Sequence, residues 1–178
     1  TWNWLKVNET PIKWSNKIEP CEIAAEGDAV ATETEQLSDI ETGAGREADA
    51  IFATENTAKY QILADNAGQD KTVRLHISGK KDAHTAGCVE IVAKENSTLT
   101  VVMDSRVAPD ATKEEDSTAE ASLAVRVRMK VESGASVRLV QVQMPQEHET
   151  LLSDIGGNLI GEGAKVESVS YTHLTLPT

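Results

Sequence analysis

The side chains best suited to metal chemistry in this sequence are two histidines and a cysteine, His76, His84 and Cys88. Zinc and iron bind imidazole and thiolate groups, and such sites need three or four ligands close together. His84 and Cys88 have an HxxxC spacing, and His76 falls on the preceding predicted strand, but no fourth ligand is evident. These residues are the only metal candidates. The alternative is a surface histidine on a turn and a buried, inert cysteine that begins a strand.

Paired carboxylates are the other candidate chemistry, because a β-helical enzyme that cleaves glycans would need two acids at a fixed separation. Asp104 and Asp154 end or open predicted strands and are the acids placed to face a groove. With 29 acidic residues in the chain, however, such pairs arise by chance. The sequence contains no GxSxG, HExxH, GxxxxGK[ST] or GxGxxG motif. We therefore expect no catalytic residue, no cofactor-binding residue and no enzyme.

The composition argues against several classes of partner. The 178 residues carry a net charge of -12, so neither a nucleic-acid surface nor an anionic membrane face is expected. Cys21 and Cys88 form no CxxC motif, which favours free thiols in a reducing, cytoplasmic compartment over a disulfide. No apolar stretch approaches the ~20 residues of a membrane span, and no signal-peptide pattern is present.

Residues 1–57 are expected to form an N-terminal arm followed by a short helix. All three tryptophans, Trp2, Trp4 and Trp14, lie in the first twenty residues. Their large rings predict an arm that docks against the body of the protein, or alternatively one that binds a partner.

The rest of this N-terminal region is acidic and then helical. Residues 21–45 have few apolar side chains, which predicts a solvated surface segment with a short strand at best. Residues 46–56 place Ala48, Ile51 and Phe52 at helical spacing, which predicts a short helix.

Residues 58–168 are expected to form the first part of a β-rich core, in a chain that we expect to be truncated at its C-terminal end. Apolar and polar residues alternate along seven predicted strands, at residues 58–64, 72–78, 88–93, 98–104, 123–131, 137–144 and 152–160. The acidic stretch 108–121 reads as an exposed loop between two of them. The three methionines, Met103, Met129 and Met144, are expected to fill the core.

A small turn recurs before several of these strands. It starts at Asp70, Asn96, Gly134 and Gly163, at offsets of 26, 38 and 29 positions, and each copy leads into an aliphatic residue. A supersecondary unit that repeats at this scale is typical of a solenoid. We therefore expect a parallel β-helix, with a β-sandwich as the alternative.

The last ten residues, 169–178, read VSYTHLTLPT and carry no charged side chain. The string can be back-translated into a sequence that matches a sequencing-library adapter read in frame, so we interpret it as a non-native tail. The alternative is a genuine C-terminal strand. On the first interpretation the strand at 163–168 is the last native one, and its uncovered edge should promote aggregation.

An ordered set of segments resembles one known family. These segments are TWNWLKVN, VRLHISG, HTAGCVEIVAKENSTLTVV, VRVRMKVESGASVRLVQVQ and LSDIGGNLIGEGAKVE. The similarity that they carry covers essentially all of residues 1–168. The segments are similar to the SufB/SufD family of scaffold proteins for iron–sulfur cluster assembly, with a start closer to SufD than to SufB.

The resemblance implies a right-handed parallel β-helix with flanking helical regions. It also implies two partners: a SufB-type scaffold subunit, and a SufC-type ATPase bound through a C-terminal helical region that no part of this chain matches. The iron–sulfur cluster would be carried by the assembled complex. Cys21 and Cys88 match none of the family's functional positions, so the chain itself is expected to bind no cofactor.

Three other functions remain open at this point. The chain could be a SufB-type subunit, a β-helical enzyme acting on polysaccharide, or a structural β-solenoid that mediates protein contacts. The acidic charge argues against an acidic polysaccharide substrate.

Overall fold

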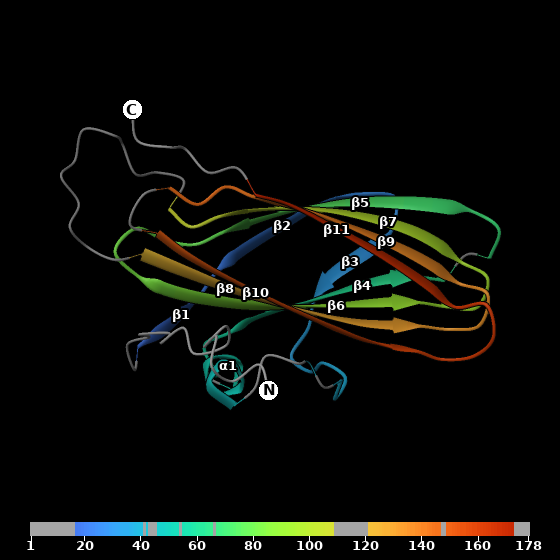
Figure 1. Cartoon of the computed structure of the whole chain (residues 1–178), viewed down its shortest axis with the longest axis horizontal. Helices are drawn as coiled ribbons and strands as arrows, with labels where there is room; N and C mark the ends of the chain where they lie inside the picture. Colours follow the sequence, from blue (N-terminus) through green and yellow to red (C-terminus); the bar gives the residue numbers. More distant parts are fainter. Residues whose placement is uncertain are drawn as a thin grey trace, which may run out of the picture.

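The structure is a computed structural model, and it describes residues 17–40, 42, 46–53, 55–65, 67–108, 121–146 and 149–172. The described chain is mainly β, with two mixed sheets that face each other and one short helix against the outer face of one sheet (Figure 1). The elements are β1 (Ile18–Pro20), β2 (Glu22–Gly27), β3 (Val30–Glu33), α1 (Arg46–Phe52), β4 (Ala58–Ala64), β5 (Asp70–Ser78), β6 (His84–Ala93), β7 (Thr98–Arg106), β8 (Ala121–Val131), β9 (Ser136–Gln143), β10 (Glu149–Leu159) and β11 (Lys165–Thr172).

Successive strands alternate between the two sheets. Sheet A has the order β10-β8-β6-β4-β3, with β1 also on β6, and sheet B has the order β11-β9-β7-β5-β2. From β4 onward every pairing is parallel and joins strands that are two apart in sequence. β2 and β3 pair antiparallel with β5 and β4, so they close the first edge of each sheet.

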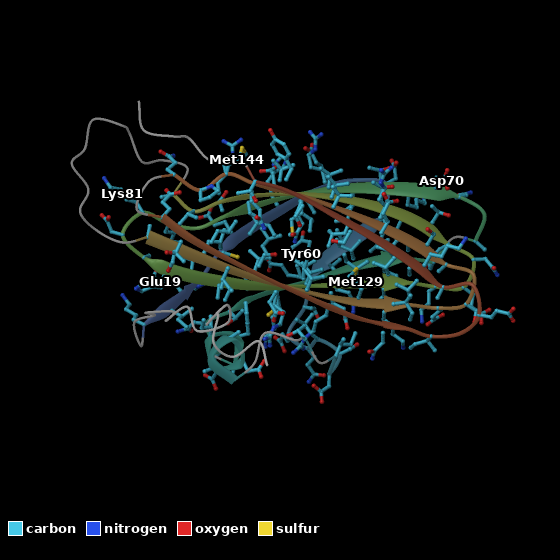
Figure 2. All side chains as sticks on the ribbon, viewed as in Figure 1. Glu19, Tyr60, Asp70, Lys81, Met129 and Met144 are labelled. Carbon is cyan, nitrogen blue, oxygen red and sulfur yellow. The ribbon has the colours of Figure 1, made fainter. Side chains whose placement is uncertain are left out.

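The core lies between the sheets because each strand turns its alternate, aliphatic residues inward. In β8, Val125, Val127, Met129 and Val131 are buried in the main apolar cluster, as the alternation predicted. Met103 is buried there too, whereas Met144 follows β9 and lies outside the cluster. Figure 2 shows Tyr60 between the two layers, with Asp70 and Lys81 toward opposite ends of the molecule.

The recurring turn is a column of left-handed residues at one end of the sheets. Gly68, Asn96, Gly134 and Gly163 have φ angles of 76°, 58°, 67° and 78°, and each precedes a strand of sheet B. A Cβ at Gly134 would stand 2.3 Å from the Asn96 Oδ1, so a larger residue at position 134 would displace the Asn96 side chain of the preceding turn as well as strain a left-handed backbone. The sequence alignment of the first turn was wrong: Gly68, not Asp70, matches Asn96, because Asp70 pairs with Thr98.

The predicted strand and helix positions are largely confirmed. The helix spans Arg46–Phe52, and β4 has the predicted bounds. Two expectations were wrong. The acidic segment 21–45 contains two strands, β2 and β3, and β6 begins at His84 rather than at Cys88. The tryptophan arm and most of the loop 108–121 lie outside the described residues.

The segment interpreted as a non-native tail begins inside β11, which pairs with β9 up to Thr172. Pairing does not report the origin of a segment, so that interpretation stays a prediction. Among the described helices, none has the length and apolar character needed to cross a membrane.

Candidate functional site

The structure does not bring the three predicted metal ligands together. His84 and Cys88 lie on one face of β6. They are four positions apart along the strand, and the rise of a strand therefore places their Cα atoms about 13 Å apart. His76 lies on β5, in the other sheet. His84 contacts the Ser122 hydroxyl. No group of three or more His, Cys, Asp or Glu side chains in the described part of the chain is arranged to hold a metal ion.

His76 instead links three neighbouring strands of sheet B. Its Nδ1 lies 2.6 Å from Asp104 Oδ2 on β7, and its Nε2 lies 3.0 Å from Glu26 Oε1 on β2. The bond with Glu26 and the charges of both acids raise the pKa of His76. The same bond lowers the pKa of Glu26. A protonated imidazole donates to both carboxylates, so this contact ties the antiparallel strand β2 to the parallel part of the sheet.

The two cysteines are buried free thiols on different faces of sheet A. Cys21 belongs to the main core, whereas Cys88 packs under α1 in a smaller apolar cluster. Burial raises the pKa of Cys21 to about 12 and also raises the pKa of Cys88. Because the thiolate is the form that attacks electrophiles and binds metals, neither residue is prepared for that chemistry.

The acids considered for glycan cleavage do not form a pair. Asp104 lies on sheet B and bonds to His76, while Asp154 lies in the middle of β10 on sheet A. Asp154 accepts a hydrogen bond from Arg126. Facing sheets stack about 10 Å apart, and these two carboxylates bind partners on different sheets rather than sharing a groove.

A buried ionic network around Arg126, which we call the Arg126 network, lies on the outer face of sheet A. Arg126 is only 3% exposed, and its Nε donates to Asp154 Oδ2 at 2.6 Å. Its Nη2 donates to Asp49 Oδ1 of α1 at 2.7 Å. The guanidinium lies 4.4 Å from the centre of the Phe52 ring. Thr42 donates its hydroxyl to the same Asp154 oxygen. The network therefore holds α1 and the segment before it against β8 and β10.

A second buried charge, Glu90 on β6, fixes the neighbouring segment. Its carboxylate accepts the Ser38 backbone N–H at 2.9 Å and the Gln61 amide at 2.6 Å. Burial opposes ionisation, but these bonds outweigh it and hold the pKa of Glu90 below its usual value. Arg128 donates to the Ser38 carbonyl at 2.9 Å. Polar side chains of sheet A thus anchor Ser38 and Thr42 over its outer face.

The alternation along residues 123–131 places Arg126 and Arg128 on the side of the strand opposite its valines, but it does not predict what they contact, so both anchors were missed. A signal was present, however. The outward row of sheet A also contains small or apolar side chains, Ala86, Cys88 and Ala124, which pack with Ile51 and Phe52 of α1. Apolar side chains on the outer face of a sheet must be buried by another element, and the predicted helix at residues 46–56 was the element that could bury them.

A cavity of about 500 Å³ opens beside the Arg126 network. It is lined by Asp39, Ile40, Thr42, Asp49, Phe52, Ala53, Arg126 and Arg128. Arginines and acids line it together, and Arg126 is already paired with Asp49 and Asp154. Arg128 also lines the cavity; its Nη1 donates to the Ser38 carbonyl, while its buried Nε has no hydrogen-bond partner among the described residues. Because two acids lie beside these arginines and the lining contains no cysteine, serine or histidine, we assign the cavity a structural role.

The second notable feature is the last edge of each sheet. Within the described residues β10 pairs only with β8, and β11 pairs only with β9. Large apolar side chains are exposed along this edge: Leu159, Ile160, Val169 and Tyr171. Unpaired backbone groups beside exposed apolar side chains are what a further strand would need in order to add to a sheet.

Comparison with known proteins identifies no relative. No family model matches the chain, and neither curated proteins nor solved structures give a match.

Proposed function

We propose that the two sheets are two faces of a right-handed parallel β-helix, in which each coil contributes one strand to each sheet, and that the chain is a scaffold subunit of SufB/SufD type. One observation carries the proposal. From β4 to β11, consecutive strands alternate between sheets and pair in parallel two strands apart, with a left-handed residue at each tight turn. In this arrangement each coil covers the apolar edge of its neighbour. It is also the fold that the resemblance implies.

The proposed role is to hold partners rather than to catalyse. Among the residues that the structure describes, the groups considered for chemistry are engaged: His76 with two acids, Asp154 with Arg126, and both cysteines in apolar clusters. In contrast, the β10–β11 edge offers backbone groups and apolar side chains to a further strand. Such an arrangement favours an interaction surface over an active site.

The proposed partners are a SufB-type scaffold subunit, contacted through the β-rich body, and a SufC-type ATPase. The family resemblance places the ATPase contact in a C-terminal helical region that this chain does not match. The iron–sulfur cluster is then cargo assembled on the complex, and this chain contributes no ligand to it. A cytoplasmic location follows from the same proposal.

Co-purification tests this assignment. This chain should co-purify with a SufB-type subunit from the same genome but should not capture a SufC-type ATPase on its own. Capture of the ATPase by this chain alone would contradict the placement of that contact. A SufB-type subunit remains an alternative identity, and binding of this chain to a SufD-type subunit rather than to a SufB-type one would favour it.

A polysaccharide-active β-helix and a purely structural interaction module are separable from this proposal by simpler observations. A neighbouring set of polysaccharide-utilisation genes would favour the enzyme. A purely structural module would not bind a SufB-type subunit.

A further inference from the structure

A cleft opens at the first edge of the two sheets, opposite the edge formed by β10 and β11. At this first edge the antiparallel strands β2 and β3 begin the two sheets. Its volume is about 450 Å³, which is within the range of small-molecule sites. Its lining residues come from the β1–β2 junction, the end of β3 and the start of β4, namely Pro20, Cys21, Glu22, Ile23, Glu33, Thr34, Ala58, Lys59 and Tyr60.

The floor of this cleft is apolar. Ile23, Ala58 and Tyr60 are partly buried and pack against the main core. Ala58 pairs in register with Gly87 on β6, and a Cβ at Gly87 would lie 3.4 Å from Ile23 Cδ1. The same Cβ would stand 2.4 Å from Cys21 Sγ, so Cys21 and Ile23 pack over Gly87 and form this wall of the cleft. A flat apolar group can enter here and lie against the Tyr60 ring.

The rim of the cleft is acidic. Glu22 and Glu33 are both exposed at its mouth. The one cationic lining residue, Lys59, directs its ammonium to the Glu35 carbonyl oxygen at 3.1 Å. The chain as a whole carries a net charge of -12, so its field also attracts cations.

We propose that this cleft binds a small organic cation with a flat apolar body. The ring lies on Ile23 and Ala58 beside Tyr60, and the ammonium group lies between Glu22 and Glu33. An aromatic face and nearby carboxylates are the two features that favour a bound amine. This site is independent of the proposed scaffold role and stands whether or not that role is correct.

Three probes with the same indole ring test the proposal on the whole chain. Tryptamine carries a positive charge, 3-methylindole is neutral and indole-3-acetate is negative. We expect tryptamine to bind with a Kd on the order of 1 mM, as its size allows. We expect indole-3-acetate to bind at least tenfold more weakly, with 3-methylindole between them. Amide chemical shifts in ¹H–¹⁵N NMR spectra should move at Ile23, Glu33, Ala58 and Tyr60.

Matched variants separate charge from shape. Glu33→Gln keeps the shape of the rim and should weaken tryptamine binding several-fold while leaving 3-methylindole unchanged. Glu167→Gln, an exposed acid on β11, should change neither. The proposal is overturned if tryptamine gives no saturable shifts at the cleft, if indole-3-acetate binds as tightly as tryptamine, or if Glu33→Gln and Glu167→Gln weaken tryptamine equally.

Discussion

The substitution Arg126→Met gives the sharpest test of how the outer face of sheet A is held. The side chain of Asp154 is 3% exposed, and among the described residues Arg126 is its only charged partner. The substitution removes that partner and leaves Asp154 only the hydrogen bond from the Thr42 hydroxyl. Leaving one member of a buried ion pair uncompensated costs about 3–5 kcal/mol. The lost bond to Asp49 adds at most ~1 kcal/mol, because that carboxylate is 57% exposed. Loss of the contact with Phe52 adds roughly 0.5–1 kcal/mol. We therefore expect Arg126→Met to lower the free energy of unfolding by about 4 kcal/mol or more in total.

Two comparisons make this number interpretable. The double variant Arg126→Met, Asp154→Leu removes both buried charges and should recover most of the loss, since apolar replacements of buried pairs are often neutral. Arg138→Met breaks an exposed pair with Glu167, whose side chains are 57% and 61% exposed, and should cost less than ~1 kcal/mol.

Urea unfolding followed by far-UV circular dichroism at 25 °C measures all four proteins, with the free energy of unfolding taken by linear extrapolation. Equal losses for Arg126→Met and Arg138→Met would refute the reasoning. So would a double variant that is no more stable than Arg126→Met, because the cost would then come from lost packing rather than from an unpaired charge.

Four further outcomes follow from the structure. His76→Gln should destabilise the chain below about pH 6.5, because the raised pKa keeps His76 protonated between its two acids there. The difference in stability between His76→Gln and the original chain should fade as the pH rises through that pKa. Urea midpoints at pH 5.5 and pH 9 measure it. Gly87→Ala should lower the free energy of unfolding by about 1–3 kcal/mol, because its Cβ would stand 2.4 Å from Cys21 Sγ. Adding Cys21→Ala should recover part of that loss. Unchanged stability of Gly87→Ala would show that the strands shift freely. Both thiols should resist a thiol reagent in the native chain and react after denaturation, because both are buried. Burial raises the pKa of Cys21 to about 12 and also raises the pKa of Cys88. Rapid labelling of the native chain would contradict the buried placement of these thiols. The chain should self-associate with rising concentration in light scattering, and the exposed substitutions Val169→Lys and Tyr171→Lys should reduce this, with equal scattering counting against an open edge.

Residue alternation was enough to place most of the parallel strands. Along β8 the row Val125, Val127, Met129 alternates with charged residues, and such a period cannot fit a helix. Repeated turn residues then indicated that strands stack at a regular interval. The misplaced first turn shows the limit of this method. Asp70 resembles Asn96 in type, but the turn geometry depends on a left-handed residue, and Gly68 supplies it.

The strands β2 and β3 and the Arg126 network were not predicted, for two different reasons. In β2 alanine occupies both faces, so Ala24 and Ala25 weaken the contrast between inward and outward positions. For Arg126, the strand pattern sets only the direction of the side chain. Whether that direction is solvent or a buried interface depends on where α1 docks, which is a tertiary fact.

The most direct test of the proposed scaffold role is an isothermal titration of this chain into a SufB-type scaffold subunit from the same genome. A SufC-type ATPase that binds the same preparation of the subunit serves as the control for its competence. The account predicts saturable binding with one copy of this chain per subunit. No binding to a subunit that still takes up its ATPase would contradict it.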